Sequence, residues 1–113
     1  MLPEIDVARL SRWVEDRNTG LPEPVRSQIR YELDLTDRSA TLLECRPTWD
    51  GVGEVWTRFP IARLRYTSSR NEWSLYWRDS NLKFHLYDLV PPTPTVADLL
   101  EEVDRDPTAI FWG

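Results

Sequence analysis

The stretch from Ile61 to Tyr87 constrains the fold most, because its apolar and polar residues alternate with a period of two. This period is typical of strands that bury one face. A two-residue turn at Ser69 and Arg70 predicts an antiparallel pair of strands with one apolar face. The predicted pairs are Tyr66 with Trp73, Leu64 with Leu75, and Ala62 with Trp77.

A second turn, with Asp79 and Ser80 as its central residues, predicts a third strand. Its predicted pairs are Trp77 with Leu82, Leu75 with Phe84, and Trp73 with Leu86. Both turns then leave the apolar side chains on the same face. The stretch is therefore predicted to be a three-stranded antiparallel meander.

The opposite face of this meander is predicted to be polar and mostly basic. It is the candidate binding face, with Arg63, Arg65, Ser74, Tyr76, Lys83 and His85. Cations that flank Tyr76 can hold an anion or present the ring to a stacking partner. A sheet face with alternating Arg also stays hydrated without any ligand, so the pattern has a purely structural interpretation as well.

The charge of the chain is unevenly divided. Residues 54–87 hold six Arg or Lys against three acids, so they carry +3 while the other residues carry -8 of the total of -5. The net negative charge and the isoelectric point near 4.8 argue against general affinity for nucleic acid or anionic membranes. The net positive charge is therefore confined to residues 54–87.

The chain before the meander is predicted to form one helix and three strands. Residues 5–17 form an amphipathic helix, with Leu10, Trp13, Val14 and Arg17 on one stripe. Residues 28–36 and 40–46 form a hairpin that pairs Leu33 with either Leu42 or Leu43, depending on the loop length. Residues 54–58 form a further strand, which Pro60 separates from the next.

The chain after Val90 is predicted to form an extended linker and a second helix. Thr95 and Asp98 have the spacing of a capping box, and Asp106 followed by Pro107 ends the helix. Its face with Glu101, Glu102 and Asp104 is predicted to meet water. The apolar tail Ile110, Phe111 and Trp112 is expected to dock on the domain.

These elements predict a single domain over residues 1–113 with an α+β fold. It has two layers, in which a mainly antiparallel sheet of five or six strands packs one face against the N-terminal and C-terminal helices. The other sheet face is open. Four of the six tryptophans have positions in the core, whereas Trp49, in a turn, is the best candidate for an exposed aromatic contact.

Several runs resemble the bacterial domain of unknown function 3024 family: PIARLRY at 60–66, EWSLYWRDSN at 72–81, KFHLY at 83–87 and LLEEVDRDPTAIFWG at 99–113. The resemblance is specific in combination and covers about half of the chain. It implies a small α+β domain. The family has no assigned activity, so the resemblance implies no catalytic residues.

Cys45 and His85 are the only cysteine and the only histidine. A lone cysteine forms no internal disulfide, and one histidine gives no zinc spacing, so no metal or cofactor is expected. Cys45 is interpreted as a core residue. Ser74 and His85 with Glu72 or Asp88 would be the residues of a hydrolytic triad, but cross-strand neighbours supply no strained elbow and no oxyanion hole.

The leading hypothesis is a noncatalytic accessory or interaction protein whose basic open face, or a sheet edge, binds a protein or a small anionic ligand. The alternative is a small hydrolase or nuclease-like enzyme that uses His85 with nearby carboxylates. A third hypothesis, single-stranded nucleic acid bound across Tyr76, is disfavoured by the net charge. The N-terminal run has acids from Glu4 onward and no long apolar segment, so a cytoplasmic location is expected, and a homodimer remains open.

Overall fold

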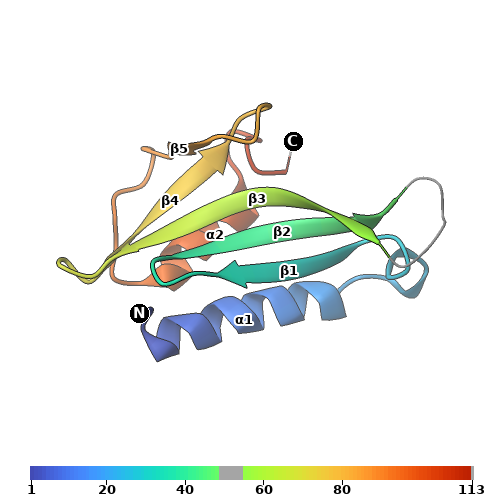
Figure 1. Ribbon diagram of the computed structural model, residues 1–113, viewed down its shortest axis with the longest axis horizontal. Coiled ribbons are helices and arrows are strands. Elements are labelled where there is room, and N and C mark those ends of the chain that lie inside the picture. Colours follow the sequence, from blue (N-terminus) through green and yellow to red (C-terminus); the bar gives the residue numbers. More distant parts are fainter. Residues whose placement is uncertain (49–54, 113) are drawn as a thin grey trace.

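The computed structural model describes residues 1–48 and 55–112, and these form an α+β fold with one antiparallel sheet (Figure 1). The sheet has five strands in the order β1-β2-β3-β4-β5, so each strand pairs with the next along the chain. The elements are α1 (Glu4–Thr19), the 3-10 turn η1 (Glu23–Val25), β1 (Arg30–Leu35), β2 (Ser39–Pro47), β3 (Trp56–Thr67), β4 (Glu72–Arg78), β5 (Phe84–Leu86) and α2 (Val96–Arg105).

Both helices pack on the same face of the sheet, as the apolar alternation predicts. In Figure 1, α2 lies behind the strands and α1 runs alongside β1, and each helix contacts the sheet and the other helix. Trp73 and Leu64 from the sheet, Leu10 from α1 and Leu99 from α2 are almost fully buried in one core. Burial of large apolar side chains is the main stabilising term in such a layer, at about 1.5 to 3 kcal/mol each.

The C-terminal end of α1 also forms hydrogen bonds with backbone groups at the edge of the sheet. The Asn18 side chain donates to the carbonyl of Tyr31 at 2.8 Å and accepts from its amide at 2.7 Å. One amide group therefore pairs with β1 as a neighbouring strand would. This contact joins the first predicted helix to the first strand.

The register of two hairpins follows the sequence pattern. Leu33 lies opposite Leu42, which resolves the choice that the loop length left open. Tyr66 lies opposite Trp73 and Leu64 opposite Leu75, as predicted. The apolar face of these strands therefore meets the helices.

The predicted break at Pro60 is wrong, because β3 is continuous from Trp56 to Thr67. Leu42 pairs with Ala62 and Leu43 pairs with Pro60, so Ile61 is an extra residue that forms a β-bulge. A bulge tolerates a proline that has no amide hydrogen to donate to the ladder. The strand therefore passes through Pro60 instead of ending there.

The predicted register of the third strand is also wrong. Trp77 lies opposite His85, three residues beyond the predicted partner Leu82. An odd shift reverses the faces of the strand. Phe84 and Leu86 consequently lie on the open face, and His85 lies on the helix side.

The second helix and the tail lie where the sequence places them, although the cap differs. Thr95 precedes α2 without a side-chain capping bond, and the predicted capping box does not form. Past the end of α2, Asp106 has a left-handed backbone, and its carboxylate accepts the amides of Phe111 and Trp112 at 3.1 and 2.9 Å. These bonds turn the tail back, and Phe111 is buried in the core.

Candidate functional site

A pocket of about 830 Å³ opens on the sheet face away from the helices. It extends from the turn between β1 and β2, across β3 and β4, to the loop before β5. Its lining residues are Thr36, Asp37, Arg38, Ser39, Arg63, Arg65, Tyr76, Leu82, Lys83 and Phe84. The pocket therefore brings together segments that are far apart in the sequence.

The wall formed by the β1–β2 turn is fixed by a hydroxyl group. The Thr36 Oγ1 atom accepts the backbone amides of Arg38 and Ser39 at 3.3 and 3.0 Å, and it lies 2.8 Å from the Ser39 Oγ atom. The carbonyl of Arg38 also accepts the amide of Tyr66 at 2.7 Å. The backbone that bears Arg38 is therefore held in place, whereas its side chain is exposed.

Arg63 is held by two contacts on the floor of the pocket. Its Nε atom donates to the Thr41 hydroxyl at 2.9 Å, and its guanidinium lies 4.1 Å from the ring centroid of Phe84. A guanidinium fixed at Nε and stacked on a ring keeps its two terminal nitrogens as donors. Arg63 is therefore oriented before any ligand binds.

The opposite wall is organised by the carboxylate of Asp79. One oxygen accepts the amides of Asn81 and Lys83 at 2.8 and 3.0 Å, and the other lies 2.7 Å from His85 Nε2. The hydrogen bonds from His85 and from the Lys83 amide lower the pKa of Asp79 below its usual value. The loop is longer than the predicted two-residue turn because these bonds hold it, with Leu82 in the left-handed region at a φ of 63°.

The pocket has an excess of unpaired positive charge. Arg38, Arg63, Arg65 and Lys83 face one acid, Asp37, which gives the lining a net charge of +3. Across residues 1–48 and 55–112, the side chains of Arg38, Arg65 and Lys83 form no hydrogen bond or ion pair. Like charges in one concave surface raise the local potential and attract anions.

The structure brings four of the seven predicted binding residues into this pocket: Arg63, Arg65, Tyr76 and Lys83. Ser74 lies opposite Arg65 on the same face but does not line the pocket. Trp49 lies outside the described residues.

Among the predicted binding residues that the structure describes, His85 lies on the helix side of the sheet and not on the predicted open face. It pairs with Trp77 across the strands, and its ring packs on the Trp77 ring at 4.8 Å between centroids. Ser74 lies on the open face, so a triad of Ser74 and His85 does not form. The reason is the three-residue shift that the Asp79 loop introduces.

Sequence reasoning missed Arg38 and the hydroxyl groups of Thr36 and Ser39. They enter the pocket because β2 pairs with β3 and places Ser39 opposite Arg65. A prediction of that pairing would have found them, since the turn then lies beside the basic strand. The alternation within residues 61–87 does not indicate that the turn between β1 and β2 lies beside β3.

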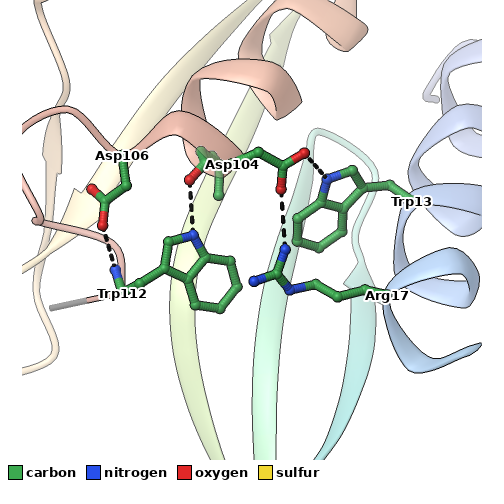
Figure 2. Close-up of polar contacts among 6 residues, drawn as sticks. Trp13, Arg17, Asp104, Asp106 and Trp112 are labelled. Atoms are coloured by element: carbon green, nitrogen blue, oxygen red, sulfur yellow. Dashed lines mark hydrogen bonds and ion pairs between the residues drawn. The ribbon is translucent and has the colours of Figure 1, made fainter. Parts of the chain in front are cut away.

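A second cation cluster joins the two helices and the tail, and Figure 2 shows it. The Arg17 guanidinium lies 3.9, 5.1 and 5.2 Å from the ring centroids of Trp112, Tyr31 and Trp13. It also forms a 3.1 Å ion pair with Asp104, whose other oxygen accepts Trp13 Nε1 at 3.1 Å. This cation is enclosed by its own chain, so we assign the cluster to the fold.

Two further polar groups belong to the interior. The Tyr87 hydroxyl donates to Glu102 at 2.7 Å, and burial together with this bond raises the pKa of Tyr87 to about 12. Cys45 is fully buried, as interpreted from the sequence, and burial raises the pKa of its thiol. A buried thiol with a raised pKa is a poor nucleophile.

Within the described residues, His, Cys, Asp and Glu do not gather in any group of three that could hold a metal ion. The helices of this part of the chain are also too short or too polar to cross a membrane.

The fold and the pocket define an α+β protein with a five-stranded antiparallel sheet and a basic concave surface on its open face. The chain belongs to the domain of unknown function family DUF3024, whose model matches residues 2–113. This confirms the resemblance and extends it to nearly the whole chain.

One curated protein is similar over part of the chain. It is a holocytochrome c-type synthase from Gallus gallus, 30% identical over 73 residues, which are 54% of this chain and 27% of that protein. The chain thus spans about a quarter of the relative. No solved structure matches the chain.

Proposed function

We propose that the protein is a noncatalytic binding protein that holds a small anionic ligand in the basic pocket. The observation that supports this most is the combination of three unpaired cations with a preoriented Arg63 in one concave surface. Arg63 is a fixed donor, so it loses little conformational freedom on binding and favours affinity.

The shape of the open face favours a small ligand over a protein partner. The volume of about 830 Å³ lies in the range of small-molecule sites, which is about 300 to 1,000 Å³. A flat face would instead favour a protein surface. The walls rise on two sides, from the Thr36–Ser39 turn and the Asp79–Lys83 loop.

A hydrolase that uses His85 has less support. His85 has a carboxylate partner, Asp79, at 2.7 Å, but Asp79 also accepts two backbone amides that hold the loop, and Ser74 lies on the opposite face of the sheet. We also propose a cytoplasmic location, which the lone and buried Cys45 supports, since disulfides are typical of oxidising compartments.

The test is calorimetric titration with inorganic phosphate at low salt. In the variant with both Arg65→Ala and Lys83→Ala, we expect the affinity to fall at least about tenfold, because each lost charged hydrogen bond contributes about 1.5 to 3 kcal/mol. Arg70→Ala is the matched control. Arg70 is an exposed cation in the β3–β4 turn, outside the pocket, so its variant should bind as the wild type does.

Binding that is unchanged in the double variant, or reduced equally in Arg70→Ala, would contradict the proposal. The first result would place the anion elsewhere. The second would show that only the overall charge matters.

A further inference from the structure

We infer that the ligand of the basic pocket is a phosphate monoester of an aromatic compound, the chemical class that includes nucleoside monophosphates. This inference rests on the proposed function and adds the chemistry of both ends of the ligand. It follows from the charged part of the pocket and from a second, apolar part beside it.

The charged part fits a phosphate better than a singly charged group. A monoester phosphate carries close to two negative charges at neutral pH and three acceptor oxygens. The lining offers a net charge of +3 with three guanidinium groups, which match phosphate geometry with paired donors.

The wall formed by the turn between β1 and β2 also offers a hydroxyl group as a hydrogen-bond donor. Thr36 and Ser39 share one hydrogen bond between their hydroxyl oxygens, 2.8 Å apart. Each hydroxyl has one hydrogen, so whichever group donates to the other, the second hydrogen is left over. It can bind a phosphate oxygen.

The apolar part consists of Tyr76 on the floor and Leu82 at the rim. Leu82 is 56% exposed, although it is a large apolar residue, and its left-handed backbone is unfavourable for a side chain with Cβ. An apolar group held at this position lines the pocket instead of packing in the core. Covering it requires an apolar part of the ligand.

The planar groups of the pocket favour an aromatic ring over an aliphatic one. Tyr76 lies opposite Arg63 across the strands, and one face of the Arg63 guanidinium is already stacked on Phe84. Aromatic rings stack on tyrosine and on guanidinium planes. Tyr76 also has no hydrogen-bond partner for its hydroxyl within residues 1–48 and 55–112, so this group is available to a ring substituent.

The surroundings favour a small molecule over a nucleic acid strand. Asp34 lies on the same open face, because it pairs with Thr41, and Thr41 pairs with Arg63. Its neighbour on this face, Glu32, is already neutralised by ion pairs with Arg30 and Arg58. A long polyanion that leaves the pocket toward β1 would meet the exposed carboxylate of Asp34. One phosphate group would avoid it.

The experiment compares phenyl phosphate, cyclohexyl phosphate and inorganic phosphate by calorimetry. The two esters have the same charge and similar size but differ in aromaticity. We expect phenyl phosphate to bind about tenfold more tightly than cyclohexyl phosphate. Nucleoside monophosphates should likewise bind more tightly than ribose 5-phosphate.

Variants of Tyr76 separate the two parts of the pocket. Tyr76→Leu should remove the preference for phenyl phosphate and leave the affinity for inorganic phosphate within about twofold, whereas Tyr76→Phe should keep the preference. Arg65→Ala should weaken all three probes. Thermal unfolding of each variant verifies that it is folded, and Tyr76→Phe supplies the test if Tyr76→Leu is not.

Equal affinities for the two esters would overturn the inference and leave the proposed function intact. Failure of all three probes to bind would overturn both. Tighter binding of a single-stranded oligonucleotide than of any monophosphate, with a steep dependence on salt, would overturn the small-ligand class.

Discussion

Two arginine clusters in this protein have opposite environments. Arg17 is enclosed by three aromatic rings and the carboxylate of Asp104, whereas Arg65 points into a pocket where it has no partner in the described part of the chain. Both clusters contain cations beside aromatic residues. They differ in whether the chain itself supplies the counter-charge.

The difference indicates that the Arg17 cluster stabilises the fold, whereas the cations of the pocket are available for binding. The Arg17 Nε atom is buried without a hydrogen-bond partner among the described residues, so the rings and Asp104 must offset its desolvation. That arrangement stabilises the docking of the tail. Arg65 is exposed, so it is expected to contribute little to the fold and to be available to an anion.

The largest expected effect is on stability and comes from removing the Arg17 side chain. Arg17→Ala should lower the free energy of unfolding by about 2 to 3 kcal/mol, because it removes several cation–π contacts and an ion pair. Arg65→Ala, the same change in the pocket, should stay within about 0.5 kcal/mol of the wild type. Urea denaturation measures both, and equal losses would erase the distinction between the two clusters.

A smaller effect is expected from ionising Tyr87 in the core. Its pKa is raised from 10.0 to about 12, so the folded state keeps a proton that the unfolded state loses. The stabilisation is complete below pH 10 and is lost as the pH rises toward 12, with a loss of roughly 1 kcal/mol by pH 11. Tyr87→Phe should flatten this part of the stability curve in denaturation at several alkaline pH values.

The smallest effect is expected at the loop that positions Lys83. Asp79→Asn weakens the bonds to two amides and to His85, so phosphate affinity should fall only about threefold. The lowered pKa of Asp79 has the opposite sign to that of Tyr87. Its contribution is present above the ordinary value of 3.8 and is lost as the pH falls through the folded value. An acid titration that is identical in Asp79→Asn and wild type would exclude this role.

The sequence predicted the fold well where local alternation decides it. The pairing of Tyr66 with Trp73 follows from the period of two and a short turn, and the five-stranded sheet is within the predicted range. The third strand failed because a side chain, Asp79, sets the loop length through its own hydrogen bonds. Alternation contains no signal for such a loop.

The candidate site was predicted in part for the same reason. Arg63, Arg65 and Tyr76 lie on strands whose faces alternation assigns, so they were found. Arg38 was missed because it reaches the pocket only through the pairing of β2 with β3. Glu102 was expected to face water, but it is buried, and its carboxylate accepts a hydrogen bond from the Tyr87 hydroxyl.

The bulge at Ile61 determines which residues the open face displays. Two consecutive residues, Ile61 and Ala62, are buried there, and the alternation of β3 changes phase at this point. Arg58 and Arg63, an odd number of positions apart, can share one face only because of this extra residue. If the ladder continued past Pro60 without the bulge, Ile61 would pair with Leu42 and Arg63 with Ala40, so Arg63 and Arg65 would turn toward the helices and Leu64 outward. The pocket therefore depends on the bulge as much as on the charges of Arg63 and Arg65.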